Sequence, residues 1–469
     1  MNINSYDLVP IDHDPFFTGE IERVIPTAET QQEIWLSCAI GGRDANCSYN
    51  ESISLELEGT LAVATLKEAL YDIIRRHEAL RYTFSADGRQ IHVTADSLPE
   101  FHYEDISDQT TDTQRQFLAE FGNRDAAEPF DLSKGPLFRM SLFKLADEMH
   151  LLRLTAHHIV CDGWSFGIIL EEVCEIYRST LAGRQPVLPD VIPMSKYNRE
   201  MDAYANSEGY GQTLTYWLNK YQAIPEPLIL PTDRLRPEER TYESRRDDFV
   251  LDAALVQGIK QLGQKNGLSL VNTLLISFEV YLSRLTGRSD IVVGLPTAGQ
   301  AATGHFNLVG HCVNLLPIRS SVVSSVSFDE HLKRRKSQLL DDYDHQLFTF
   351  GTLLKSLKIK RDSSRVPLVP IVFNIDMGMD TNVSFPGIKH TLISNPRTFE
   401  NFEIFLNVTG SRDTFVLEWS YNTHLFDAGT IKKMMDGFEA LLRAVIQTPS
   451  MPIGALSVTN AQHADTITP

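Results

Sequence analysis

The stretches LFRMSLFKL (137–145) and MHLLRLTAHHIVCDG (149–163) determine how the fold of this chain is interpreted. Both are largely apolar and long enough for a strand, and a short polar turn at 146–148 separates them, so the sequence predicts a pair of strands. Side chains alternate between the two faces of a strand, so the adjacent His157 and His158 must point in opposite directions. Only one of the two imidazoles can therefore meet a substrate directly.

The residues after the second strand predict a turn and then a helix. Asp162 and Gly163 are typical turn residues, and a helix is expected over 166–181, with Ser165 as its N-cap and Gly183 beyond its C-terminus. Backbone N–H groups at the start of a helix favour negative charge. The histidines therefore precede a segment that suits the charge developing on a carbonyl oxygen.

Other interpretations of this segment remain open at the level of the residues. Two adjacent histidines also occur as ordinary core or surface residues. His157, His158 and Asp162 are possible metal ligands, although the opposed faces of the histidines argue against a metal site. Ser165 with His158 would suggest a hydrolase, but Ser165 is better explained as a helix cap. Cys161 is a possible nucleophile, although a packing role is the simpler interpretation.

The first half of the chain predicts further alternation of strand and helix. SISLELEG (52–59) has the period-two pattern of a half-buried strand. The helix that follows has Thr65 and Glu68 at the spacing of a capping box. Its apolar face would consist of Leu66, Leu70, Ile73 and Ile74.

The prolines at 186, 189 and 193 interrupt both kinds of pattern, so the crossover between two halves is expected at 183–195. The second half predicts a helix at 271–287 and strands at 290–296, near 368–376 and at 415–421. The expected units are an N-terminal linker or docking segment (1–20), a first lobe (21–182), the crossover (183–195), a second lobe (196–455) and a C-terminal linker (456–469).

The composition restricts the possible functions. With 469 residues, 42% of them apolar, the chain can form two sizeable units with their own cores. The net charge of -18 would repel a nucleic-acid backbone, and there is neither a leader pattern nor an apolar run of membrane-spanning length. We therefore expect a cytoplasmic protein without nucleic-acid or membrane partners. The five cysteines lack metal-ligand spacing and are expected to be reduced.

The segment HHIVCDGWS (157–165) resembles the HHxxxDG signature of the condensation domains of nonribosomal peptide synthetases, a branch of the chloramphenicol-acetyltransferase-like superfamily. Further stretches resemble motifs of that family in the expected order. They are TAETQQEIWL (27–36), RHEALRYTF (76–84), LPTDRLRP (230–237), VGHCVNLLPIR (309–319), DHQLFTFGTLL (344–354) and RDSSRVPLVPIVFN (361–374). Together these motifs are specific, whereas each one alone is weak.

The resemblance implies an α/β fold of two chloramphenicol-acetyltransferase-like lobes, arranged as a V-shaped pseudo-dimer around a central tunnel. An upstream carrier protein would deliver an acyl or peptidyl thioester as donor, and a downstream peptidyl carrier protein would deliver an aminoacyl thioester as acceptor. Each substrate would arrive on a phosphopantetheine arm, and the chain itself would bind no cofactor and no metal. Other synthetase domains would adjoin the chain, and its product would be an amide in the biosynthesis of a secondary metabolite such as an antibiotic.

The resemblance also assigns roles within the motif. His158 would be the catalytic residue that accepts or orients the proton of the attacking amine, and His157 would face the protein interior. Asp162 would organise the loop that carries His158. In many relatives it pairs with an arginine, and Gln300 occupies that place here. Gly163 would let the backbone approach the substrate closely.

Three more residues are substrate-binding candidates by their motif positions: Trp164, Ser165 and Asn314. For Trp164, ordinary core packing is an equally good interpretation. By contrast, Arg76, His77 and Arg81 are assigned to structural roles. Ser269 lies in a stretch that superficially resembles a carrier-protein attachment site, but the context of such a site is missing.

Related activities remain as alternatives. Heterocyclising relatives carry aspartates in place of His157 and His158, and epimerising relatives usually have Trp-Arg after the position of Ser165, so condensation is favoured. An acyltransferase that uses acyl-CoA, or a catalytically silent carrier-docking module, remains open. Ala156, Cys161, Gln300 and the stretch 311–317 resemble condensation domains that follow polyketide modules, which suggests a hybrid assembly line.

Overall fold

The two strands predicted around the histidines form a hairpin at the centre of the first sheet. β6 (Phe138–Ala146) and β7 (Met149–His157) pair antiparallel, which confirms the prediction. β2 (Asn50–Glu58), also predicted, pairs antiparallel with the other side of β7. The five strands lie in the order β12-β2-β7-β6-β5, where β12 is Lys389–Ser394 and β5 is Phe101–Asp105.

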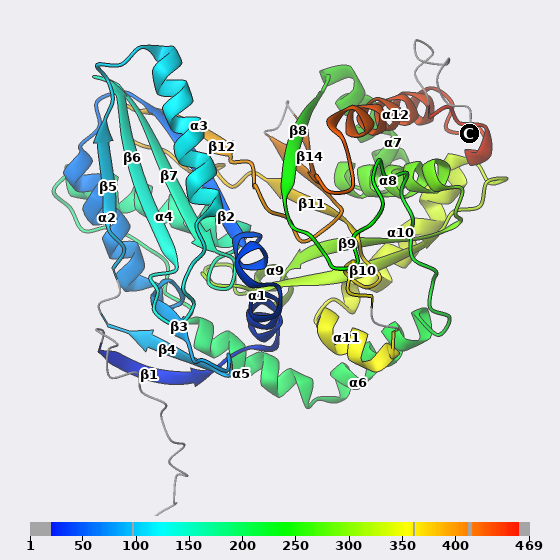
Figure 1. The fold of residues 1–469 in the computed structure, drawn as a ribbon, viewed down its shortest axis with the longest axis horizontal. Coiled ribbons are helices and arrows are strands. Elements are labelled where there is room, and N and C mark those ends of the chain that lie inside the picture. Colours follow the sequence, from blue (N-terminus) through cyan, green and yellow to red (C-terminus); the bar gives the residue numbers. More distant parts are fainter. Residues whose placement is uncertain (1–19, 96–97, 360–361, 411–414, 459–469) are drawn as a thin grey trace, which may run out of the picture.

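The computed structural model describes residues 20–95, 98–359, 362–410 and 415–458. Apart from a few residues at their inner ends, the expected linkers 1–20 and 456–469 lie outside the described residues. The described residues form two α/β lobes that lie side by side, as Figure 1 shows.

Helices cover both faces of the first sheet. Phe138 and Phe143 are an odd number of positions apart on β6, so they point to opposite faces. Phe143 packs against Phe121 of α3 (Thr111–Ala127) with ring centroids 4.8 Å apart, and Phe138 packs against Phe166 of α4 (Gly163–Leu181) with centroids 6.5 Å apart. α2 (Val63–Arg76) packs beside α4.

The apolar face predicted for α2 is confirmed, because Leu66, Leu70, Ile73 and Ile74 are all buried. The capping box predicted at Thr65 and Glu68 is wrong. The helix begins at Val63 after Ala62, so both residues lie inside it. The remaining elements of this region are α1 (Glu29–Cys47), the 3-10 helix η1 (Glu78–Arg81) and a small sheet of β1 (Ile21–Pro26), β4 (Gln90–Thr94) and β3 (Tyr82–Phe84).

The second lobe contains a six-stranded sheet in the order β10-β9-β11-β13-β14-β8. The helix predicted at 271–287 and the strands predicted at 290–296, 368–376 and 415–421 are confirmed as α8, β9, β11 and β14. The strands are β8 (Ser244–Leu251), β9 (Asp290–Ala298), β10 (Val313–Ser321), β11 (Ile371–Met377), β13 (Ile404–Gly410) and β14 (Phe415–Asn422). The helices are α7 (Ala253–Asn266), α8 (Leu270–Thr286), α9 (Gly299–Thr303), α10 (Phe328–Asp344), α11 (Phe350–Leu357), α12 (Ala428–Gln447) and the 3-10 helix η2 (Ile453–Ala455).

The second half of the sequence also completes the first lobe. β12 lies beside β2 (Figure 1) and pairs antiparallel with it. Leu308, Val309 and Phe385 are buried in the first lobe's core. The chain passes between the lobes after α4, through α5 (Met194–Ala205) and α6 (Glu208–Lys220). The crossover at 183–195 stays a prediction. The pairing of β12 with β2 shows that the expected second lobe (196–455) contributes a strand to the first sheet.

A membrane-spanning helix is not found within the described ranges. No single helix there is long and apolar enough to cross a bilayer, and only α7 and α8 taken together pass by length and composition, with a bend of 97° between them.

A buried ion pair joins two helices of the second lobe. Arg335 of α10 donates from Nε and Nη2 to the carboxylate of Glu279 of α8 at 2.9 and 2.7 Å. The side chains are 1% and 0% exposed. Because neither charge can reach water, each one depends on the other.

We predict that Arg335→Met lowers the free energy of unfolding by about 3–5 kcal/mol, because it leaves a buried carboxylate without its partner. Urea denaturation monitored by circular dichroism measures this loss. The matched control is Arg334→Met, since Arg334 is 54% exposed and its ion pair with Glu330 should contribute less than about 1 kcal/mol. The double variant Arg335→Met with Glu279→Leu should recover most of the stability. Equal losses of stability in Arg335→Met and in the control Arg334→Met would contradict the prediction.

Candidate active site between the lobes

A cavity of about 250 Å³ lies between the two lobes. The first lobe contributes residues of α1, of β2 and of the segment after β7, and the second lobe contributes residues of β9, β10, β11 and the segment 397–405. The lining residues that bear on chemistry are Thr30, Glu33, Tyr49, Glu51, His158, Gly163, His311, Asn314, Asp376 and Arg397.

The two adjacent histidines face opposite ways, as the strand geometry predicts. His158 is partly exposed and lines the cavity, whereas His157 is fully buried. The backbone N–H of His158 donates to the carbonyl of Tyr49 at 2.8 Å, which extends the pairing between β2 and β7 by one residue. The position of His158 is therefore tied to the sheet.

His157 stabilises the turn that carries its neighbour. Its Nδ1 accepts a hydrogen bond from the N–H of Ile159 at 3.2 Å, so the proton of the neutral ring is on Nε2, which lies 3.9 Å from Cys38 Sγ. Gln31, from the opening motif, donates to the carbonyl of Ile159 at 2.9 Å. Burial is the main cause that lowers the pKa of His157 to about 3, so its ring is neutral at physiological pH.

Asp162 is fully buried and accepts hydrogen bonds from both lobes. It is the N-cap of α4 and accepts from the N–H and the hydroxyl of Ser165 at 2.9 and 2.7 Å. Gln300 Nε2 donates to its two carboxylate oxygens at 3.2 and 3.0 Å, and the N–H of Cys312 donates at 3.0 Å. Gln300 thus occupies the position expected for an arginine, and all of these donors are neutral.

Ser165 has a different place from the one predicted. The N-cap is Asp162, and Ser165 lies in the first turn of α4. Its hydroxyl donates its single proton to Asp162 and accepts from the N–H of Gly310 at 3.0 Å. The sequence interpretation missed that the residues GWSFG (163–167) match the spacing of a hydrolase nucleophile elbow. Ser165 is nevertheless fully buried and does not line the cavity.

The other two substrate-binding candidates differ in position, because Asn314 lines the cavity and Trp164 does not. Asn314 lines the central cavity and also a second cavity of about 90 Å³, and its side chain donates to the carbonyl of Gln346 at 2.7 Å. Trp164 is 38% exposed, and its indole N–H donates to the carbonyl of Phe306 at 3.0 Å. It is therefore neither a core residue nor part of the cavity lining.

Gly163 permits a close approach between the lobes. A Cβ atom at this position would lie 2.9 Å from Oδ1 of Asp376, a residue of β11 on the opposite side of the cavity. Any larger residue would push this carboxyl group away. The expected role of Gly163 in admitting a substrate stays a prediction.

The cavity is rich in carboxyl groups, which the sequence interpretation missed. Burial raises the pKa of Glu33 to about 7, with a smaller contribution from Glu29, and burial with the nearby Glu51 raises that of Asp376 to about 7. Arg397 pairs with Glu51 and, at 3.4 Å, with Glu400. No local signal in the sequence marks these residues, because their roles depend on the approach of distant segments.

His311 is the other residue that sequence reasoning did not single out. Its Nδ1 lies 3.2 Å from Nδ1 of His158, and the two rings are nearly perpendicular at 80°. The sequence pointed to it only as part of the stretch 311–317.

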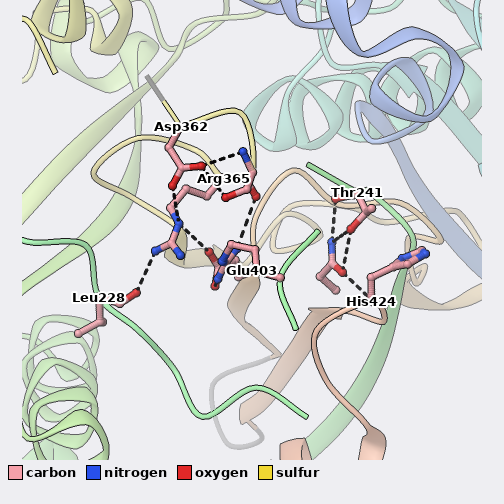
Figure 2. Close-up of polar contacts among 9 residues, drawn as sticks. Leu228, Thr241, Asp362, Arg365, Glu403 and His424 are labelled. Carbon is pink, nitrogen blue, oxygen red and sulfur yellow. Dashed lines mark hydrogen bonds and ion pairs between the residues drawn. The ribbon is translucent and has the colours of Figure 1, made fainter. Parts of the chain in front are cut away.

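A polar network joins loops of the second lobe (Figure 2). Arg365 donates to the carbonyl of Leu228 at 3.4 Å and pairs with Asp362 at 3.3 Å and with Glu403 at 4.0 Å. Arg236 pairs with the same Glu403 at 2.8 Å. Two of the family motifs, 230–237 and the described part of 361–374, therefore meet at one buried carboxylate.

Comparison with known proteins places the chain among synthetase domains. A family model of the condensation domain matches residues 21–468. Tyrocidine synthase 3 of Brevibacillus parabrevis is 30% identical over 443 residues, which are 94% of this chain and 7% of that protein. Surfactin synthase subunit 1 of Bacillus subtilis (strain 168) is 30% identical over 448 residues, 94% of this chain and 12% of that protein. The chain thus spans a small part of the length of these relatives.

Solved structures share the fold. A four-domain nonribosomal peptide synthetase, crystallised in its holo form with AMP and glycine, has a TM-score of 0.84 at 19% identity, covering 97% of this chain and 35% of that one. The starter condensation domain of rhizomide synthetase in complex with C8-CoA has a TM-score of 0.82 at 22% identity, covering 92% and 97%. These similarities confirm the predicted fold class.

We predict that Asp162→Asn lowers thermal stability and amide formation together. The amide nitrogen of asparagine cannot accept, so Gln300 Nε2 or the N–H of Cys312 would face another donor, at a cost of about 1–3 kcal/mol for each donor left unpaired. Thermal denaturation and a product assay on the same samples check this. The control is Gln300→Met, which removes one donor and should cost less, and a loss of activity at unchanged stability would contradict the structural role.

We predict that His157→Gln is less stable than the wild type at pH 7.5 and that the difference narrows by about 1.4 kcal/mol at pH 5.5. The folded wild type keeps His157 neutral over this range because the pKa is about 3, while the unfolded chain takes up a proton below about 6.5. Acid therefore favours unfolding of the wild type at this position and has no such effect on the variant. Urea denaturation at the two pH values measures the difference in the free energy of unfolding between wild type and variant. If this difference is the same at both pH values, His157 is not a buried neutral imidazole.

Proposed function

The chain belongs to the condensation-domain family of nonribosomal peptide synthetases, and we propose that it joins a donor acyl thioester to the amino group of an acceptor aminoacyl thioester in the cavity between its lobes. The observation that supports this most directly is the orientation of the two histidines. His158 turns its ring into the cavity, and His157 supports the turn from the buried side. An intact imidazole in the cavity favours an enzyme over a silent docking module.

In the proposed reaction, the acceptor amine attacks the thioester carbonyl carbon of the donor. A C–N bond forms, the C–S bond breaks, and the donor carrier's thiol leaves. A proton must move from the amine nitrogen to the departing sulfur, and a neutral imidazole can accept or orient it at neutral pH. General-base assistance typically contributes about 10²–10⁴-fold, and holding two tethered reactants in place can contribute more.

The carboxyl groups of the cavity support an amine as the acceptor. A protonated amine that enters next to Asp376 would be stabilised by its carboxylate, and Asp376 changes protonation near neutral pH. The acceptor would then be held close to Gly163, the first residue of α4, which follows the turn after His158.

The partners in this proposal are an upstream donor carrier and a downstream acceptor carrier, each delivering its substrate on a phosphopantetheine arm. The central cavity and the smaller cavity share Thr30 and Asn314 in their linings, which is consistent with a path for one arm past Asn314. The chain's own residues would guide the arms and bind the acyl and amino groups. Adjoining synthetase domains would supply both carriers.

We predict that His158→Ala lowers amide formation by about 10²–10⁴-fold while the thermal denaturation midpoint changes little, because the side chain faces the cavity. The assay combines an octanoyl-loaded carrier protein with a panel of aminoacyl N-acetylcysteamine thioesters and detects the amide by mass spectrometry. The control is His102→Ala, a partly exposed histidine on β5. A His158→Ala protein within a few-fold of wild type would refute the role of His158, and equal turnover with octanoyl-CoA in place of the loaded carrier would favour the acyl-CoA alternative.

A further inference from the structure

The ring of His158 has a specific neighbour, His311. Their Nδ1 atoms are 3.2 Å apart, within hydrogen-bond distance, and the ring centroids are 5.1 Å apart. Two nitrogens can form this bond only if one carries a proton and the other presents a lone pair. The contact therefore couples the tautomers of the two rings.

The surroundings of His311 keep its ring neutral and fixed. The side chain is only 6% exposed, and burial together with the nearby His158 and His157 places the pKa of His311 well below its usual value. Its two chain neighbours are held by the hydrogen bonds described above, since Gly310 is bonded to Ser165 and Cys312 to Asp162. Asp162 and Ser165 are bonded to each other and to this segment. They therefore fix both the loop of His158 and the segment that carries His311.

We propose that His311 is a positioning residue that accepts the Nδ1 proton of His158 and thereby leaves Nε2 of His158 as the unprotonated nitrogen. This inference rests on the proposed function and adds a second residue to it. When His158 takes up a proton at Nε2, its Nδ1–H becomes a stronger donor, and the neutral His311 stabilises the cation through the existing bond. The arrangement resembles the base and orienting group of other imidazole catalysts, with a histidine in place of a carboxylate.

A neutral partner suits this position. A carboxylate beside His158 would favour the protonated form of its imidazole, so a smaller share of the rings would be free to accept a proton from the amine. A neutral imidazole fixes the tautomer without that effect. A leucine or phenylalanine at 311 would fill similar space and leave Nδ1 of His158 without this acceptor.

The first test reads the tautomer directly and does not depend on turnover. Wild-type protein labelled with ¹⁵N-histidine is studied by NMR of the ring nitrogens, and the His158 signals are identified by their loss in His158→Ala. We expect Nδ1 of His158 to be protonated and Nε2 to be unprotonated. A proton on Nε2 of His158 in the wild type would overturn the proposal, whatever the activity.

The second test compares two substitutions in the amide-forming assay. His311→Leu should lower kcat by about tenfold or more with a smaller change in the KM of the acceptor thioester, while His311→Asn, whose side-chain oxygen can accept the same hydrogen bond, should retain kcat within about threefold. The matched control is His305→Leu, on the same segment but bonded to Glu200. Equal losses in the leucine and asparagine variants, or no loss in either, would contradict the positioning role.

The two tests separate this inference from the proposed function. If the wild type forms no amide with any substrate of the panel, the proposed function fails, and the NMR spectrum still decides the tautomer of His158. If the wild type is active and the spectrum shows the opposite tautomer, only the role of His311 is lost.

Discussion

The buried carboxylate of Asp162 is the interaction on which the site depends. It caps the helix that follows the two histidines and accepts hydrogen bonds from Gln300 and Cys312, which are about 140 to 150 residues away in the sequence. A carboxylate can remain buried in this way when its oxygens are satisfied by several donors and when it lies at the N-terminus of a helix. Here all of the donors to the Asp162 carboxylate are neutral groups. One residue therefore fixes the loop of His158 in the first lobe relative to the segment before β10.

This constraint explains how the partly exposed imidazole of His158 can be held in place without full burial. His158 must face the cavity, so its own side chain can gain little from packing. Its geometry is set instead by backbone bonds to the sheet, by the bond from Ile159 to His157 and by the cap at Asp162. The polar groups around it are buried, where unpaired donors are costly, so the arrangement resists alternative conformations.

The sequence predicted most of the first sheet and the direction of the histidines, because strand alternation and turn signals are local. It misplaced the cap of α4, because Asp162 and Ser165 are both good N-cap residues three positions apart, and the Ser165 hydroxyl is instead engaged by Asp162 and by the N–H of Gly310. It did not predict the transfer of β12 to the first sheet, because a six-residue strand carries no information about its partner. Asp376 and His311 acquire their positions only when segments far apart in sequence meet across the cavity.

The exchanged strand also bears on how the cavity is maintained. β12 comes from the second half of the chain and pairs with β2, whose other neighbour is β7, the strand that leads into His158. On the other side of the cavity, β11 carries Asp376 into contact range of Gly163, where no side chain intervenes. A rigid separation of the lobes would break either this strand pairing or the bonds to Asp162. The distance between His158 and the opposite wall of the cavity therefore depends on the pairing of β12 with β2 and on the bonds to Asp162.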